Sequence, residues 1–269
     1  MNVTELIEEI KSKKSYLCVG LDTDISKLPD GVSKDADGIL AFNKEIINAT
    51  KDYAVSYKIN TAFYEQLGSK GWQILEKTRE MIPGNILSIA DAKRGDIGNT
   101  STMYAKAFFE TMDFDALTVA PYMGFDSVEP FLKFTTKITI VLGLTSNVGS
   151  ADFQTNGLYS PPLYKTVLER VSSWGSPDNL MFVVGATKAA ALKEIRELVP
   201  NHFLLIPGVG AQGGSAVEVC ENGANSIGGL LINSSRGIIY ASSGKDFAEA
   251  ARAKAKELAL QTQPYTAHL

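Results

Sequence analysis

The sequence predicts a single (β/α)8 TIM barrel, a closed ring of parallel strands with helices outside, over residues 1–269. Short unbroken apolar runs alternate with amphipathic stretches along the chain, which is typical of parallel strands buried on both faces. Eight strand–helix pairs fit a chain of 269 residues, 45% of them hydrophobic. No linker or low-complexity segment marks a second domain, so we expect one domain.

The expected elements follow from these patterns. The strands are expected at Tyr16–Leu21, Val55–Ile59, Ile86–Ala90, Ala116–Val119, Ile138–Leu142, Leu180–Val184, Phe203–Ile206 and Ser226–Ile232. The clearest amphipathic stretches between them are Ile39–Thr50, Trp72–Met81, Ser127–Phe134, Ala189–Leu198 and Ala216–Glu221. The segment Val3–Lys13 predicts an extra N-terminal helix that closes the bottom of the barrel.

Two further segments complete the expected organisation. The last helix is expected to begin at Asp246, with Glu249 as its capping-box partner, and to end near Leu260. The irregular stretch Asn147–Pro162 predicts either an active-site loop or a surface excursion.

Charge and hydropathy limit the class of protein. The formal net charge of -4 gives no sign of the basic face that nucleic-acid binding requires. The N-terminal stretch lacks the apolar core of a signal peptide, and no apolar run reaches the roughly 18 residues of a membrane span. We therefore expect a cytoplasmic protein without nucleic-acid or membrane partners.

The cysteines and histidines give no sign of a metal site. Cys18 and Cys220 lie within apolar patterns and are expected to be small buried hydrophobes. The two histidines, His202 and His268, stand outside any motif, so neither a Ser-His-Asp triad nor a histidine metal site is expected. The chemistry is expected to depend on Asp, Lys, Arg, Asn and Ser/Thr, without a metal or a cofactor.

Charged residues gather where the first three predicted strands end, which is the active-site face of a barrel. Asp22 follows the first strand, Lys58 and Asn60 end the second, and Asp91 and Lys93 follow the third. Strand alternation puts Asp91 and Lys93 on one side, and the alternating charges would keep one another ionised in a partly dry pocket. The alternative is a structural salt-bridge network at the barrel rim.

The last two predicted strands end in features suited to phosphate. The stretch "PGVGAQGG" (207–214) contains four glycines, which allow backbone N–H groups to approach an anion, and "NSSRG" (233–237) adds Arg236. An ordinary turn with a surface arginine is the alternative. The same loop matches G-x-G-x-x-G, but the acidic residue of a dinucleotide fold would fall near Asn233, so that interpretation is not favoured.

These motifs together resemble a known family. D-x-K-x-x-D at Asp91, Lys93 and Asp96 is similar to the signature of orotidine 5'-monophosphate decarboxylase, and "DAKRGDIGNT" resembles its second sequence subgroup, type 2. Further matches are "GLD" at Asp22, "YKIN" at Lys58 and Asn60, "LTSN" at Leu144–Asn147, "PGVGAQGG" and "SSRG". The resemblance spans nearly the whole chain.

The resemblance implies a reaction and a role for each matched residue. The reaction is decarboxylation of orotidine 5'-monophosphate to uridine 5'-monophosphate (UMP), the last step of pyrimidine biosynthesis, without metal or cofactor. Lys93 would protonate C6, and Asp91 would either stress the substrate carboxylate or keep Lys93 charged and aimed. Asp22 and Lys58 would hold the ribose hydroxyls, and Lys58 would also order the charged network. The other substrate-binding residues would be Asn60; Thr145, Ser146 and Pro207, toward the pyrimidine; and Gln212, Ser235 and Arg236, toward the phosphate.

The resemblance also implies a homodimer. Asp96, with Ile97 and Thr100, would cross the interface into the partner's active site. Two other classes remain as alternatives. One is a magnesium-dependent keto-sugar phosphate decarboxylase, whose relatives carry an acidic metal ligand where this chain has Lys58. The other is a barrel that binds a ribose phosphate without catalysis.

Overall fold

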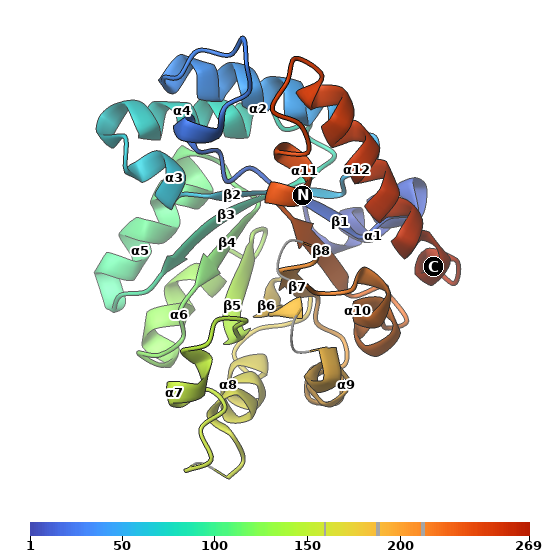
Figure 1. The fold of residues 1–269 in the computed structure, drawn as a ribbon. Helices are drawn as coiled ribbons and strands as arrows, with labels where there is room; N and C mark the ends of the chain where they lie inside the picture. The colour runs from blue at the N-terminus through green and yellow to red at the C-terminus, as the bar shows by residue number, and fades with distance from the viewer. Residues whose placement is uncertain (159, 187–188, 211–212) are drawn as a thin grey trace.

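The chain forms the expected barrel. The computed structural model describes residues 1–158, 160–186, 189–210 and 213–269. Eight parallel strands close in the order β1 to β8, each bonded to its neighbours in sequence and β1 to β8, with helices around the ring (Figure 1). The carboxyl ends of all eight strands therefore meet on one face of the barrel.

The strand bounds agree closely with the prediction. The strands are β1 Leu17–Gly20, β2 Ser56–Asn60, β3 Leu87–Arg94, β4 Ala116–Val119, β5 Ile138–Leu144, β6 Leu180–Val184, β7 Leu204–Pro207 and β8 Leu230–Ser234. The largest errors are at the end of β3, which was expected at Ala90, and at the start of β8, which was expected at Ser226. Residues 225–228 instead form a tight turn in which the Gly228 N–H donates to the Asn225 carbonyl at 3.0 Å, so the strand begins only after this turn.

The helices cover the outside of the ring. They are α1 Val3–Lys13, α2 Ala36–Thr50, α3 Ala62–Glu65, α4 Gly68–Glu80, α5 Gly98–Lys106, α6 Phe125–Leu132, α7 Ser150–Phe153, α8 Leu163–Ser172, α9 Ala189–Leu198, α10 Ala216–Gly223, α11 Arg236–Ile239 and α12 Phe247–Thr262. Shorter turns are η1 Ile25–Lys27, the π-helical η2 Ala107–Thr111 and η4 Gln263–Thr266. None of the helices among the described residues is long and apolar enough to cross a membrane.

The ends of the chain show one confirmed and one wrong prediction. Helix α1 lies across the amino ends of the strands, because Lys13 Nζ donates to the carbonyl of Ala54, just before β2, at 2.8 Å. The amino group of Met1, which precedes α1, donates to Asp115 Oδ1, just before β4, at 2.6 Å, so the helix covers the amino ends of β2 to β4 on the side where the sequence predicts it. Asp246 does precede α12, but the capping box is absent, since Asp246 Oδ1 accepts from Ser242 Oγ at 2.6 Å instead.

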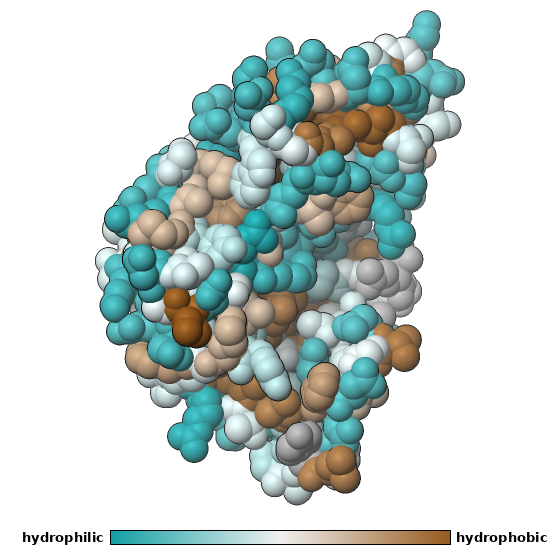
Figure 2. Space-filling view, turned by 90° about the vertical axis from the view of Figure 1, so that its left-hand side faces the viewer, coloured by the Kyte–Doolittle hydropathy of each residue, from teal (hydrophilic) through white to brown (hydrophobic). Residues whose placement is uncertain are grey.

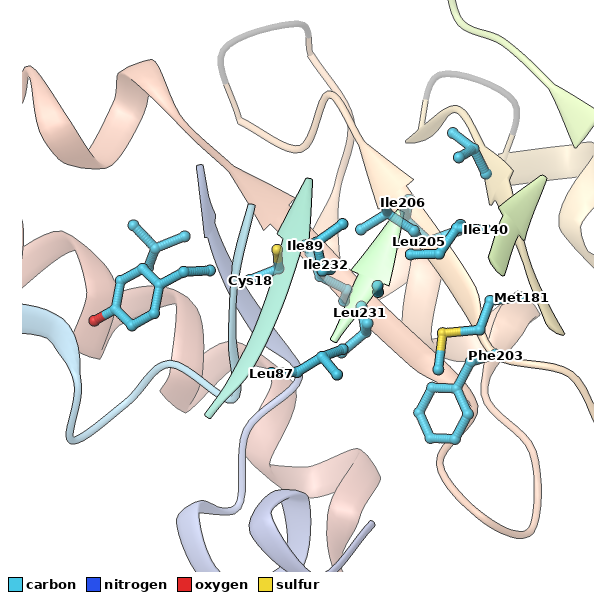
Figure 3. Close-up of a cluster of buried hydrophobic side chains, with 14 of the residues drawn as sticks. Cys18, Leu87, Ile89, Ile140, Met181, Phe203, Leu205, Ile206, Leu231 and Ile232 are labelled. Carbon is cyan, nitrogen blue, oxygen red and sulfur yellow. The ribbon is translucent and has the colours of Figure 1, made fainter. Parts of the chain in front are cut away.

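Strand alternation separates the two faces of each strand. Tyr57 points outward and its hydroxyl donates to the carbonyl of Ile47 on α2, whereas the next residue, Lys58, points into the barrel. Apolar side chains from β1, β3 and β5 to β8 gather in the core, part of which Figure 3 shows. This core continues between the strands and the helices outside them, as Phe42 and Ile46 of α2 belong to it.

His202 is a buried histidine at the amino end of β7. Its ring packs edge-on against the ring of Phe182, with the two ring centroids 5.3 Å apart. Neither nitrogen of the His202 ring has a hydrogen-bond partner among the described residues. Burial, with a smaller contribution from the charge of Arg196, lowers the pKa of His202 from 6.5 to about 4. The folded protein therefore resists protonating this ring at a pH where the unfolded chain protonates it freely.

We expect the free energy of unfolding to fall as the pH drops from 6.5 toward 4, by on the order of 2–3 kcal/mol from this group. Above pH 6.5 the ring is neutral in both states and contributes no pH dependence. Urea unfolding at pH 7 and pH 4.5 measures the difference, and His202→Phe should reduce it by this amount while keeping the contact with Phe182. An equal pH dependence in both proteins would contradict the assignment.

Candidate active site

A cavity of about 430 Å³ opens at the carboxyl ends of β1, β2, β3, β7 and β8. The polar residues expected at these strand ends line it. The lining residues are Asp22, Asp24, Lys27, Lys58, Asn60, Phe63, Asp91, Pro207, Gly208, Val209, Asn233, Ser235, Arg236 and Tyr240. The structure therefore brings seven of the predicted site residues into one cavity: Asp22, Lys58, Asn60, Asp91, Pro207, Ser235 and Arg236.

The charged cluster on β1, β2 and β3 forms a continuous chain of ion pairs. Lys58 Nζ lies 3.4 Å from Asp22 Oδ1 and 2.9 Å from Asp91 Oδ2. Lys93 Nζ lies 2.6 Å from the other oxygen of Asp91, Oδ1. The four groups thus alternate in sign; Lys58, Asp91 and Lys93 alternate as the sequence predicts, but the fourth group is Asp22 rather than Asp96.

Burial and neighbouring charges together fix the protonation states of Lys58 and Asp91 in this chain of ion pairs. Burial alone would lower the pKa of the Lys58 ammonium, but the carboxylates of Asp22 and Asp91 outweigh it and raise that pKa. Burial would likewise raise the pKa of Asp91, yet Lys58 and Lys93 hold it well below its usual range. Both groups are therefore ionised at neutral pH, which keeps a permanent field at the mouth of the barrel.

Lys93 reaches Asp91 through a bulge rather than through regular strand alternation. Ala90 pairs with Leu117 and Arg94 with Val119, so residues 91–93 of β3 face only Thr118 of β4. Lys93 has a φ of 47°, in the left-handed region that a residue with a side chain rarely adopts. The predicted proximity is confirmed, but its geometric cause differs from the prediction.

Thr118 holds this bulge and was not identified from the sequence. The Lys93 N–H donates to Thr118 Oγ1 at 2.9 Å, and Thr118 Oγ1 donates to Asp91 Oδ1 at 3.1 Å. Thr118 is fully buried, so water does not compete for these bonds. In the sequence it is one β-branched residue in the run "ALTV", and only its inward position on β4 would have singled it out.

The loop after β8, which the sequence analysis assigned to phosphate together with the loop after β7, lies close to the first strand, β1. Ser235 and Arg236 begin α11, with Pro207 and Gly208 of the β7 loop beside them in the cavity lining. A Cβ at Gly20 of β1 would lie 1.9 Å from Ser235 Oγ, so this approach requires glycine. Gln212, the other predicted phosphate residue, lies outside the described residues.

Thr145 and Ser146 follow β5 and do not line the cavity. The Thr145 N–H donates to Gln154 Oε1 at 2.8 Å, and its hydroxyl donates to Asn147 Oδ1 at 2.6 Å. Ser146 packs against the backbone after β6, where a Cβ at Gly185 would lie 2.7 Å from the Ser146 Cβ. The segment after β5 is therefore held at the rim, beside β6, by its own contacts.

Asp96, Ile97 and Thr100 also lie outside the cavity lining. Asp96 Oδ1 accepts from the Ile97 N–H at 2.8 Å, and the Ile97 side chain is 56% exposed. Arg94, by contrast, turns away and pairs with Glu65 and the ring of Tyr104, as a structural residue does. The monomer therefore does not bring Asp96 to the other charged residues.

Several lining residues have no motif in the sequence, among them Lys27, Asn233 and Tyr240. The Tyr240 hydroxyl accepts from the Asp24 N–H at 2.7 Å, a contact between positions far apart in the chain that no local pattern could indicate. Among the described residues, no group of three or more His, Cys, Asp or Glu side chains is placed to hold a metal ion.

Comparison with known proteins gives consistent matches. A model of the "Orotidine 5'-phosphate decarboxylase / HUMPS family" matches residues 15–253. The chain is 57% identical over 262 residues to the orotidine 5'-phosphate decarboxylase of Bacteroides fragilis strain YCH46, covering 96% of each protein. It is 58% identical over 266 residues to that of Christiangramia forsetii, covering 98% of this chain and 97% of the relative.

Solved structures agree with these matches. A structure of Leishmania donovani OMP decarboxylase superposes with a TM-score of 0.85 at 36% identity, over 99% of each chain. A structure of Leishmania donovani UMP synthase superposes with a TM-score of 0.86 at 38% identity, over 97% of this chain and 56% of that one.

Proposed function

The chain belongs to the orotidine 5'-phosphate decarboxylase family, and from that premise we propose how its cavity carries out the reaction. The activity is the conversion of orotidine 5'-monophosphate to UMP and carbon dioxide, which completes UMP biosynthesis. The observation that carries the mechanism is the ion-pair chain Asp22–Lys58–Asp91–Lys93 at the mouth of the barrel.

In the proposed step, the bond between C6 and the carboxylate breaks and its electron pair stays on C6. The orbital that holds this electron pair lies in the plane of the pyrimidine ring and is not conjugated with it. The negative charge on C6 must therefore be stabilised by fixed charges of the protein. The ammonium of Lys93 faces the developing negative charge and then donates its proton to C6 as carbon dioxide leaves. No metal or cofactor takes part in this proposal.

Asp91 is proposed to keep Lys93 charged and aimed. Its two oxygens together accept from Lys58, Lys93 and Thr118, which is the arrangement of an orienting carboxylate. Repulsion of the substrate carboxylate is the other interpretation, and that type of argument is contested in general. The shared contacts with two lysines support the orienting role.

The remaining residues are assigned to the parts of the nucleotide. Asp22, Lys58 and Asn60 line the cavity at the first two strands and are proposed to hold the ribose. Ser235 and Arg236 are proposed to hold the phosphate with Gln212, while Pro207 lines the pyrimidine pocket. Thr145 and Ser146, at the rim after β5, are proposed to meet the amide edge of the pyrimidine.

The direct test is an assay of orotidine 5'-monophosphate decarboxylation, following UMP and carbon dioxide with and without EDTA. We expect equal rates in both conditions. Loss of activity in EDTA would support the magnesium-dependent alternative instead, although the buried ammonium of Lys58 is a poor neighbour for Mg²⁺. Binding of the nucleotide without turnover would support the non-catalytic alternative.

We expect Thr118→Val to lower kcat about tenfold with little change in KM, because it removes one hydrogen bond to a charged carboxylate and leaves the Lys93 N–H unpaired. Valine has nearly the same shape, so the fold should persist. Thr118→Ser, which restores the hydroxyl, is the matched control and should recover most of the rate. Wild-type kcat in the valine variant would remove Thr118 from the mechanism.

We also propose a homodimer in which Asp96 completes the partner's active site. Ile97, the N-cap of α5, and Thr100 and Met103 within the helix are spaced by three and are all exposed. Met123 lies against the same turn, since a Cβ at Gly95 would be 3.4 Å from its Cε, and Tyr122 and Phe125 beside it are exposed. Figure 2 faces this side of the molecule, where hydrophobic side chains lie exposed among hydrophilic ones.

A second copy of this chain is the occupant that fits such a surface. Contiguous exposed apolar residues mark interaction sites, and this surface adjoins Asp96, which has no role in its own cavity. The same turn would therefore contribute both the contact and the shared residue.

A further inference from the structure

Lys27 lines the active-site cavity without a role in the reaction described above. The turn η1, between β1 and α2, places its side chain in the same lining as Ser235 and Arg236. Within the part of the chain that the structure describes, the Lys27 ammonium forms no ion pair: Asp24 is near enough to feel its charge but beyond ion-pair distance, and the ammonium lies over the ring of Tyr240. A cation in a binding cavity that forms no ion pair with the protein is available to a ligand.

Tyr240 fixes the position of Lys27. The Lys27 Nζ lies 5.9 Å from the centroid of the Tyr240 ring, within the range of a cation–π contact. The Tyr240 hydroxyl accepts from the Asp24 N–H at 2.7 Å and donates to the Asp22 carbonyl at 3.3 Å. Burial raises the pKa of this hydroxyl to about 12, so it stays neutral and keeps both bonds.

Asp24, the acidic residue nearest to Lys27 in the sequence, makes its hydrogen bonds with Ser26. Its Oδ1 accepts from the Ser26 hydroxyl at 2.8 Å and from the Ser26 N–H at 2.9 Å, which shapes the turn η1. These bonds lower the pKa of Asp24. The charge of Lys27 adds a smaller lowering, so the carboxylate mainly caps the turn that presents Lys27 and does not form an ion pair with it.

The charge balance of the cavity shows what is missing. The four charges of Asp22, Lys58, Asp91 and Lys93 cancel one another. A phosphate monoester carries a charge of about −1.5 to −2 at neutral pH, and Arg236 supplies only one positive charge for it. Outside the ion-pair chain and Arg236, the described residues of the lining include one carboxylate, Asp24, whose hydrogen bonds go to Ser26, and one further cation, Lys27.

We propose that Lys27 is a second phosphate-binding cation, presented by η1 and the ring of Tyr240, which together with Arg236 neutralises the nucleotide's dianion. This inference rests on the proposed function. It predicts that Lys27 distinguishes a phosphorylated substrate from the same nucleoside without phosphate, because its ammonium acts on the dianion and on no other part of the ligand.

The test compares orotidine 5'-monophosphate with orotidine as substrates for Lys27→Gln. We expect kcat/KM for the nucleotide to fall about tenfold, as expected for one charge-assisted contact in a partly exposed site, while kcat/KM for orotidine is unchanged. Lys27→Arg should recover most of the loss. Lys256→Gln, which removes an exposed lysine on α12, is the charge-matched control and should match the wild type.

A turnover-free measurement completes the test. Calorimetry should show weaker UMP binding in Lys27→Gln and unchanged uridine binding. An equal loss for nucleotide and nucleoside would reduce Lys27 to a structural residue, and no loss for the nucleotide would also overturn the proposal. Absence of decarboxylation by the wild-type protein would instead contradict the proposed function, while UMP calorimetry would still decide the role of Lys27.

Discussion

Lys93→Ala is expected to abolish detectable decarboxylation while UMP binding largely survives. In the proposed step, one ammonium both stabilises the developing carbanion and donates the proton, so a single truncation removes two effects. Proton donation contributes about 10² to 10⁴-fold and a fixed stabilising charge about 10² to 10³-fold, so we expect kcat to fall by at least about 10⁴-fold.

The fold should tolerate this change. The Lys93 side chain is 47% exposed, so its removal opens no buried cavity. Fixed-time assays of UMP formation measure the turnover. Calorimetry with UMP shows whether the binding site remains intact, and the melting temperature shows whether the fold does. Lys256→Ala is the matched control and should behave as the wild type. Near wild-type turnover in Lys93→Ala would refute the assignment of Lys93 as the proton donor.

Asp96→Ala is expected to be nearly inactive alone and to regain activity when mixed with Lys93→Ala. In a mixed dimer, one of the two sites combines an intact Lys93 with an intact Asp96 from the other chain. Random exchange makes half the dimers mixed, so about one quarter of the wild-type activity should return. Activity is measured after subunit exchange, with the exchange followed by native mass spectrometry.

This experiment also separates the shared site from simpler dimers. If exchange is complete and no activity returns, Asp96 does not serve the partner's site, even if the protein is dimeric. Mixing Lys93→Ala with Asp91→Ala provides the control, because these two residues form an ion pair within one chain and their mixed dimer contains no complete site.

Residues at strand ends were the part of the active site that the sequence could predict. Asp22, Lys58 and Asp91 each follow an apolar run, and barrel topology alone brings such positions together. Thr118 could not be found in this way, since a threonine within a strand is also an ordinary β-forming residue. Lys27 and Tyr240 meet only through loops after β1 and β8, and no local pattern encodes that contact.

The elements that the sequence analysis did not single out have equally local causes. Helix α5 begins with the polar, β-branched stretch "GNTST" and buries only Ser101 and Ala105, so its apolar periodicity is weak. At Asp246 the sequence pattern of a capping box is present. The Asp246 carboxylate nevertheless accepts a hydrogen bond from the Ser242 hydroxyl, which lies in the preceding turn, and not from the helix backbone. Such competition between neighbouring donors depends on the loop conformation, which the pattern does not contain.

The bulge that turns Lys93 toward Asp91 has a consequence for protein engineering. Transplanting D-x-K-x-x-D into the third strand of another barrel would reproduce the letters but not the geometry, because Lys93 keeps its left-handed backbone through a hydroxyl on β4. A designer would need to copy three residues of one strand opposite one threonine of the next, together with the shift in pairing between them. The transferable unit is thus a pair of strands rather than a motif.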